Sequence, residues 1–341
     1  MKRASLMILI LLLLPVPAQA EGPLRALLHS RSGQNSGQSS GAVAASLPDD
    51  GLFGGLGCKR LTKIVERHKG RLEKKAGDVV PSLSAQYGAD VRQGMDVYLP
   101  RRSTEDAPAP IIVMVHGGAW CVGDKDSGAV TENKIARWLP RGFIFVSVNY
   151  RMLPDGADVL TQAADVAQAL GYVQHHAAEW HGDSRKIILM GHSAGAHLVS
   201  LLGADAPFAA QFNLQPWLGT ISLDSAAVDV AEMMTKKHPA FYDDAFGKDE
   251  AMWATLSPLR QLSGDSIPWL GVCSGKRKDS CPQAHGFAAK AASLGVEAQV
   301  LEENLNHGEI NADLGEPGDY TEAVEAFMQG LDPDVAARFG Q

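Results

Sequence analysis

From residue 84 onward, short runs of apolar and β-branched residues alternate with longer segments of helical periodicity. The central runs, IIVMV, FIFVSV and IILM, are continuously apolar, which is typical of parallel strands that helices cover on both faces. The alternation therefore predicts an α/β fold with an eight-stranded, mostly parallel sheet. The expected strands are Ser84–Gly88, Gln93–Pro100, Ile111–Gly117, Phe143–Tyr150, Lys186–Gly191, Leu218–Asp224, Trp269–Ser274 and Glu297–Glu303.

Only a few residues connect the first two expected strands. A parallel crossover needs a dozen residues or more, so these two strands should pair antiparallel. Helices are expected at residues 160–180, 194–203, 283–294 and 318–331. The main domain then spans residues 84–332, and residues 56–83 form a helical segment ahead of it.

An insertion at residues 230–265 follows the sixth expected strand. Its aromatic and large apolar residues include Phe241, Tyr242, Phe246, Met252 and Trp253. Such a segment at the top of an α/β sheet favours either a small cap or lid over a pocket or an ordinary packed surface subdomain.

The first residues have the pattern of a secretory signal peptide. Lys2 and Arg3 precede an apolar run, and the small-residue sequence Ala18-Gln19-Ala20 follows it. The run is shorter than the roughly 18 to 20 residues that span a bilayer, so stable membrane insertion is not expected. Residues 1–20 are interpreted as a signal for export to the periplasm or the extracellular space. Residues 21–55, rich in Gly and Ser, are interpreted as a disordered linker.

Composition restricts the class of partner. The formal net charge is −8 and the chain has no block of basic residues, which argues against nucleic acid as a partner. The sequence leaves the oligomeric state open.

The chain has four cysteines, Cys58, Cys121, Cys273 and Cys281. In an exported protein they can form two disulfides, and the short spacing favours Cys273 with Cys281; buried free thiols are the alternative. No CxxC or HExxH spacing indicates a metal site, and no cofactor motif is present.

The strongest motif is Gly-His-Ser-Ala-Gly at residues 191–195, between the apolar run KIILM and the helical pattern AHLVSLLG. A GxSxG sequence between a strand and a helix is typical of a nucleophile elbow, in which a tight turn exposes the serine hydroxyl. Ser193 is therefore the candidate nucleophile. The N–H group of Ala194, the next residue, should face a developing oxyanion.

A second motif, HGGAW at residues 116–120, ends the third expected strand. Glycines at this place let backbone N–H groups turn toward a bound oxyanion. A Gly-Gly pair after a strand is often a plain turn, but its position one βαβ unit before GHSAG favours the oxyanion interpretation.

A serine nucleophile needs a base, and His307 is the best candidate because it follows the last expected strand in the sequence Leu-Asn-His-Gly. His285, in an expected helix, is a distant second. The third member should be a carboxylate that orients the imidazole. Asp279 and Asp224 both follow strands that precede His307. Asp279 is preferred because its strand comes immediately before the strand that leads to His307.

HGGAW, NYRMLP at residues 149–154, GHSAGA and the late NHG together resemble the esterase/lipase branch of the α/β-hydrolase superfamily, which includes hormone-sensitive-lipase-like carboxylesterases. The resemblance covers residues 84–331. It implies a triad of Ser193, Asp279 and His307 and an oxyanion hole made by the N–H groups of Gly118, Ala119 and Ala194. The chain has Ala119 where the family usually has a third glycine.

This resemblance implies a metal-independent serine hydrolase that cleaves small carboxylic esters through an acyl-enzyme. HGG-aromatic combined with GHSAG is also similar to kynurenine formamidases, so an amide-cleaving arylformamidase is the first alternative. A catalytically silent binding protein with a hydrolase fold is the second.

Overall fold

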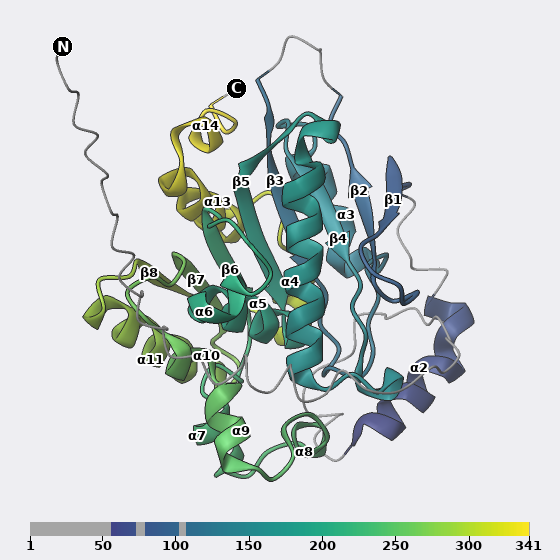
Figure 1. Cartoon of the computed structure of the whole chain (residues 1–341), viewed down its shortest axis with the longest axis vertical. Helices are drawn as coiled ribbons and strands as arrows, with labels where there is room; N and C mark the ends of the chain where they lie inside the picture. Colours follow the sequence, from purple (N-terminus) through teal and green to yellow (C-terminus); the bar gives the residue numbers. More distant parts are fainter. Residues whose placement is uncertain (1–55, 73–78, 102–106, 341) are drawn as a thin grey trace, which may run out of the picture.

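The computed structural model of the chain describes residues 56–72, 79–101 and 107–340. These residues contain one eight-stranded sheet (Figure 1). Its strands are β1 (Leu83–Gln86), β2 (Gly94–Tyr98), β3 (Ala109–Val115), β4 (Ile144–Val148), β5 (Gly182–His192), β6 (Gly219–Leu223), β7 (Trp269–Ser274) and β8 (Ala298–Glu303). The signal peptide expected at residues 1–20 and the linker expected at 21–55 lie outside the described residues.

The strands lie in the order β1-β2-β4-β3-β5-β6-β7-β8. β2 pairs antiparallel with β1 and β4, and the strands from β4 and β3 to β8 pair parallel. The predicted eight-stranded, mostly parallel sheet is confirmed, and each expected strand overlaps an observed one. Because parallel strands end at the same edge, the residues that follow β3, β5, β6, β7 and β8 gather at one edge of the sheet.

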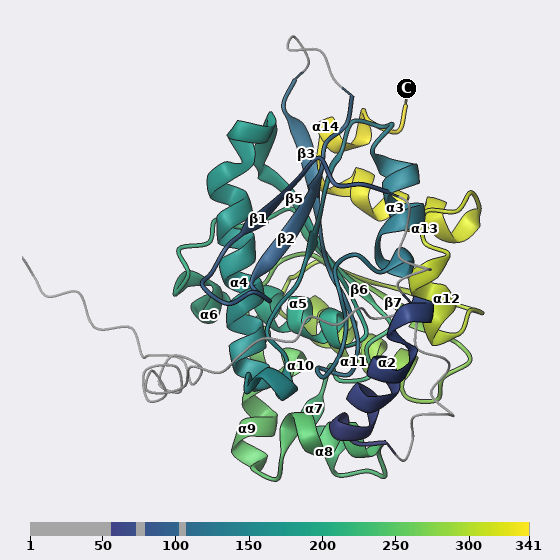
Figure 2. The ribbon, with the colours of Figure 1, turned by 90° about the vertical axis from the view of Figure 1, so that its right-hand side faces the viewer.

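Helices cover both faces of the sheet, which Figure 2 shows nearly edge-on. The long helices are α2 (Cys58–Leu72), α3 (Gly128–Trp138), α4 (Val159–His176), α5 (Ala194–Ala204), α11 (Ser280–Ser293) and α13 (Asp319–Leu331). Shorter ones are η2 (Leu153–Asp155), η3 (Ala177–Trp180), α6 (Ala206–Ala210), α7 (Val230–Met234), α8 (Ala240–Phe246), α9 (Glu250–Thr255), α10 (Pro258–Gln261), α12 (His307–Ala312) and α14 (Pro333–Ala336). α4 and α5 pack on one face, and α3 and α13 pack on the other.

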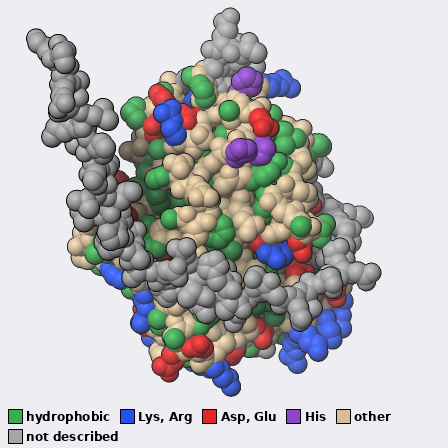
Figure 3. Space-filling model, in the orientation of Figure 1, with side chains coloured by type: hydrophobic (Ala, Val, Ile, Leu, Met, Phe, Trp, Pro, Cys, Tyr) green, Lys and Arg blue, Asp and Glu red, His purple; other side chains and the backbone are tan. Residues whose placement is uncertain are grey.

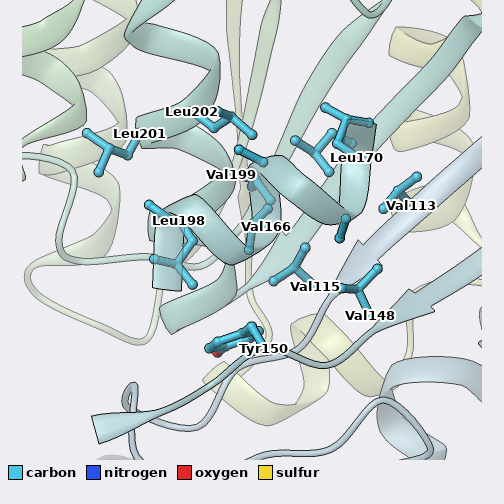
Figure 4. Packing of buried hydrophobic residues seen from close by; sticks show 14 of the residues in the cluster. Val113, Val115, Val148, Tyr150, Val166, Leu170, Leu198, Val199, Leu201 and Leu202 are labelled. Atoms are coloured by element: carbon cyan, nitrogen blue, oxygen red, sulfur yellow. The ribbon is translucent and has the colours of Figure 1, made fainter. Parts of the chain in front are cut away.

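Two hydrophobic cores, one on each face, explain the continuous apolar runs. Successive side chains of a strand point to opposite faces. Val113 and Val115 of β3 therefore join the core beneath α4 and α5 (Figure 4), whereas Ile112 and Met114 join the core beneath α3 and α13. A strand that is buried on both faces has no solvent-facing side, so its sequence does not alternate between apolar and polar residues.

The insertion expected at residues 230–265 contains the four short helices α7 to α10. The ring centroids of Tyr242 and Phe246, on α8, lie 5.7 and 4.9 Å from that of Trp120, which follows β3. The insertion therefore packs against the loop at the carboxyl end of β3.

All four cysteines are oxidised. Cys58 pairs with Cys121, and Cys273 pairs with Cys281. The favoured Cys273–Cys281 pairing is confirmed, and the alternative of free thiols is wrong.

Candidate active site

Ser193 lies at the sharp turn between β5 and α5. Its φ of 56° is in the left-handed region, and its N–H donates to the carbonyl of Leu223 on the neighbouring strand β6. Glycine is needed two positions before and two positions after this serine. A Cβ on Gly195 would lie 2.3 Å from the carbonyl oxygen of Val115, and one on Gly191 would lie 2.4 Å from the carbonyl oxygen of Gly195. The turn thus has the geometry of the predicted nucleophile elbow.

His307 is the first residue of α12, and its ring faces Ser193. Its Nε2 lies 3.0 Å from the Ser193 hydroxyl oxygen. The helix start is fixed by a capping box. The Asn306 side chain accepts from the N–H of Glu309, and the Glu309 carboxylate accepts from the N–H of Asn306. The sequence-predicted nucleophile and base are therefore within hydrogen-bonding distance.

The carboxylate that contacts His307 belongs to Asp224. The expectation that Asp279 orients this imidazole was therefore wrong. Asp224 Oδ2 lies 2.6 Å from His307 Nδ1. The Asp279 side chain is 54% exposed, and its carboxylate forms a 3.5 Å ion pair with Arg277. Asp279 stands at the start of α11, on the outer side of the loop, so its carboxylate faces solvent rather than the imidazole.

Asp224 is held from several directions. Its Oδ1 accepts from the N–H of Ser274, at 2.9 Å, and from the hydroxyl of Ser280. The residue is fully buried, and burial acts to raise its pKa. The hydrogen bond with His307 and the charge of Arg277 outweigh burial and hold the pKa of Asp224 well below its usual range. Asp224 is therefore ionised and fixed in orientation.

Sequence reasoning missed Arg277 as a site residue. One guanidinium nitrogen, Nη1, lies 2.9 Å from Asp224 Oδ2 and 3.1 Å from His307 Nδ1. The motif GKRKDS showed only that three basic residues lie together in the loop after β7. Nothing in that run distinguished the arginine that turns inward from the two lysines beside it.

The loop after β3 lies directly on the elbow. Gly118, Ala119 and Trp120 have φ values of 124°, 53° and 59°. A Cβ on Gly118 would lie 1.8 Å from the carbonyl oxygen of Val122, so this position requires glycine. A Cβ on Gly117 would lie 2.8 Å from the Cβ of Ser193. The structure thus brings the three expected oxyanion residues, Gly118, Ala119 and Ala194, around Ser193 in one cavity.

Ala194 is the first residue of α5, where a backbone N–H has no partner within the helix. The positive end of the helix dipole also faces this point. Both features favour negative charge next to the Ser193 hydroxyl.

His192, the variable residue of the elbow, supports His307 through packing. Its Nε2 lies 2.9 Å from the carbonyl oxygen of His307, and the two ring centroids are 4.5 Å apart. Burial lowers the pKa of His192 well below its usual value. A neutral ring that donates from Nε2 to this carbonyl fits these contacts. His285, by contrast, lies on the exposed side of α11.

The cavity above Ser193 has an aromatic side and a polar side. Its lining includes Trp120, Phe241, Tyr242, Asp124, Ser127 and Asn311. Within the described residues, no group of three His, Cys, Asp or Glu side chains is placed to hold a metal ion. The helices of the same residues include none that is long and apolar enough to cross a membrane.

The comparison with known families identifies the chain. A family model described as BD-FAE matches residues 95–270, about half of the chain. The chain belongs to the BD-FAE family. This match, together with the esterase relatives and structures below, confirms the predicted membership of the esterase/lipase branch of the α/β-hydrolases. The matched segment contains Ser193 and Asp224 but ends before Arg277 and His307.

Curated relatives of this BD-FAE family member include esterases. It is 36% identical over 117 residues to the probable isoprenylcysteine α-carbonyl methylesterase ICMEL1 of Arabidopsis thaliana, covering 34% of this chain and 23% of that protein. It is 31% identical over 259 residues to the esterase LipC of Mycobacterium tuberculosis, covering 71% of this chain and 63% of LipC. The chain spans about a quarter of the length of the plant methylesterases that it matches.

Solved structures of esterases share the fold of this BD-FAE family member. A truncated carbohydrate esterase from gut microbiota has a TM-score of 0.63 at 19% identity, covering 75% of this chain and 99% of that one. Esterase B from Lactobacillus rhamnosis has a TM-score of 0.62 at 18% identity, covering 82% of this chain and 95% of that one. The α/β-hydrolase fold is therefore confirmed.

Proposed function

We propose that the protein is a serine carboxylesterase that hydrolyses small carboxylic esters through an acyl-enzyme. The observation that carries this proposal is the chain of hydrogen bonds from Asp224 through His307 to Ser193, with distances of 2.6 and 3.0 Å. Esterase relatives that cover most of the chain support the same reaction class.

In this mechanism His307 Nε2 takes the hydroxyl proton as Ser193 attacks the ester carbonyl. The buried, ionised Asp224 keeps the other ring nitrogen, Nδ1, in its protonated form and stabilises the imidazolium. His307 then returns the proton to the leaving alcohol, which departs and leaves the acyl group on Ser193. Water, activated by the same imidazole, releases the acid.

The N–H groups of Gly118, Ala119 and Ala194 are the proposed oxyanion hole. The proposal is supported by the left-handed backbone at Gly118 and Ala119, by the position of Ala194 at the start of α5, and by the cavity that all three residues line together with Ser193. Fixed N–H donors need no reorganisation as negative charge develops on the substrate oxygen, which is why such groups lower the barrier.

The test compares the natural protein with Ser193→Ala and with Ser293→Ala, which changes an exposed serine at the end of α11 that does not line the cavity. We expect hydrolysis of p-nitrophenyl butyrate and fluorophosphonate labelling in the natural protein and in Ser293→Ala, and neither in Ser193→Ala. Absence of both reactions from the folded natural protein would indicate a binding protein. Faster turnover of an aryl formamide than of any ester would indicate an amidase.

We also propose that the protein is exported. The signal-like residues 1–20 support this, and so do two disulfides, which persist in oxidising compartments. N-terminal sequencing of the protein recovered outside the cytoplasm tests the proposal. A mature chain that begins after Ala20 is expected, whereas recovery only of the full-length cytoplasmic chain would contradict export.

A further inference from the structure

Helix α2 precedes the sheet and lies outside the segment that matches the family model, yet it reaches the candidate active site. One face of the helix, formed by Cys58, Leu61 and Val65, is buried. The spacing of three and four residues is that of a single helical face. Among residues 58–67 of this helix, the exposed positions are Lys59, Arg60, Lys63, Glu66 and Arg67. Figure 3 shows Lys and Arg side chains gathered where α2 lies in Figure 1.

The first turn of α2 is fastened to the oxyanion loop. Cys58 is disulfide-bonded to Cys121, which comes directly after Trp120. The N–H groups of Cys121 and Val122 both donate to the carbonyl of Gly118, at 3.0 Å each. The disulfide therefore joins α2 to the turn that contains the proposed oxyanion residues.

The same turn of α2 is also bound to the insertion at residues 230–265. The N–H of Cys58 donates to the carboxylate of Asp244 on α8, at 2.5 Å. The neighbouring residues Phe241 and Tyr242 line the substrate cavity. One end of α2 thus bridges two walls of that cavity, and Figure 2 shows α2 and α8 side by side.

Leu61, one helical turn after Cys58, is only 1% exposed and lines the same cavity. We propose that α2 is a covalently tethered wall of the substrate cavity and that Leu61 limits the size of the ester that the cavity accepts. This inference rests on the proposed esterase function. It adds to the site a residue that neither the GxSxG motif nor the family match contains.

The physical reason is steric. Leu61 presents a branched apolar side chain, and the disulfide at Cys58 prevents the helix from moving away when a larger group enters. Removing three carbons at position 61 opens space that a longer acyl or alcohol group can fill. When an apolar pocket gains or loses room for one methylene, the ratio of kcat/KM for two substrates that differ by that group changes by about tenfold or more.

The experiment measures kcat/KM for two series of esters with Leu61→Ala and with Val65→Ala as a matched control. Val65 is buried on the same face, beside Cys58 and Cys121, but it is not among the described residues that line the cavity. One series is p-nitrophenyl acetate to octanoate, and the other is acetates of methanol, butanol and 1-naphthol. Rates are normalised to the fraction of enzyme that a fluorophosphonate labels.

We expect Leu61→Ala to raise the ratio of kcat/KM for the large ester over the small ester by about tenfold in at least one series. Leu61→Phe should lower the same ratio. Leu61→Met, which keeps a side chain of similar volume, and Val65→Ala should both leave it near the natural value. An active Leu61→Ala enzyme with natural ratios in both series overturns the inference. Equal changes in Leu61→Ala and Val65→Ala overturn it too, because they reflect general loosening of α2. Absence of ester turnover and of labelling in the natural protein instead refutes the esterase function.

The tether is tested separately with Cys58→Ala and Cys121→Ala combined. We expect this double variant to accept the larger esters in the same series as Leu61→Ala, because α2 is then free to move outward. A folded double variant with natural ester preference shows that the disulfide does not hold the wall.

Discussion

Nδ1 of His307 lies 2.6 Å from Oδ2 of Asp224, although 83 positions separate the two residues in the chain. The pair meets because β6, which ends just before Asp224, and β8, which ends shortly before His307, run parallel on either side of β7 and end at the same edge of the sheet. A buried carboxylate in direct contact with the imidazole is the arrangement that orients a general base. The same contact sets the first prediction.

Asp224→Asn is expected to lower kcat by about 10³- to 10⁴-fold, because the amide can present a donor to His307 and leaves the imidazolium without its countercharge. Asp279→Asn, at an exposed position, should change kcat by less than about threefold. Both variants are measured at equal folded fraction, judged by circular dichroism. Loss of activity in Asp279→Asn with retention in Asp224→Asn would contradict the assignment.

Arg277 is expected to act as a positioning residue, because it contacts Asp224 and lies 3.1 Å from His307 Nδ1. Arg277 donates to Oδ2 of Asp224, the same oxygen that lies beside Nδ1 of His307, so it fixes the carboxylate against the ring. In Arg277→Gln, kcat should therefore fall by about tenfold with little change in KM, because Asp224 is less firmly oriented. The other groups nearby, Asp279 and His192, are unchanged in this variant.

Arg277→Lys is the matched control for charge. It keeps the positive charge but should retain only part of the natural kcat, since an ammonium does not reproduce the planar fork of the guanidinium. Natural values of kcat and KM in Arg277→Gln would show that the guanidinium does not position Asp224.

Stability is expected to fall as the pH decreases from about 6.5 to 4. Burial lowers the pKa of His116 and of His197 to about 4 each. Above the unfolded pKa of about 6.5 both states are neutral. Below it the unfolded chain gains protons that the folded protein cannot accept until about pH 4. Each histidine therefore lowers the free energy of unfolding by up to about 3 kcal/mol near pH 4.

Urea unfolding at pH 7.0, 5.5 and 4.5 measures this slope. His197→Gln, which can still donate to the carbonyl of Leu256 that Nε2 contacts at 2.8 Å, should make the slope shallower. His285→Gln, on the exposed side of α11, should leave it unchanged. Equal slopes in all three proteins would mean that His197 is not a source of the acid sensitivity.

Removing the Cys273–Cys281 disulfide should affect both stability and turnover. The eight-residue separation gives a loop-closure contribution of about 2.5 kcal/mol to the free energy of unfolding. The closed loop also supplies three of the donors to Asp224, from Ser274, Arg277 and Ser280. Cys273→Ala combined with Cys281→Ala should lower the melting temperature and also kcat per folded molecule. A lower melting temperature with unchanged kcat would show that the loop keeps its geometry without the bond.

Chelation is expected to leave activity unchanged, because a Ser–His–Asp site activates its nucleophile without a metal ion. Dialysis against EDTA followed by an assay with p-nitrophenyl butyrate checks this. Activity that is lost on dialysis and restored by zinc would require a different mechanism.

The sheet could be predicted from sequence because burial on both faces leaves uninterrupted apolar runs such as residues 111–115. Helix α3 was not expected, and its buried face shows why. Lys134 is 1% exposed and donates from Nζ to the carbonyls of Ala129 and Asn311. In the sequence a lysine indicates a solvated position. The sequence pattern therefore does not show that this side of the helix is buried.

The candidate nucleophile and base could be predicted from local patterns, but their carboxylate partner could not. Asp224 and Asp279 both satisfy the order nucleophile, acid, base along the chain. The choice depends on where their strand ends lie relative to His307, which only the packed sheet decides. Asp224 adopts a left-handed φ of 54° at the end of β6 and donates its N–H to the carbonyl of Val272 on β7. No residue type in the sequence marks that turn.

The strand order also has a consequence during biosynthesis. Ser193 and Asp224 follow β5 and β6, whereas His307 follows β8, which is made after the other seven strands of the described sheet. A chain that folds as it emerges from its N-terminus can build the elbow and the oxyanion turn well before the imidazole exists. Incomplete chains therefore carry a serine with no proton acceptor, and the onset of ester turnover reports that the final strand has joined the sheet edge.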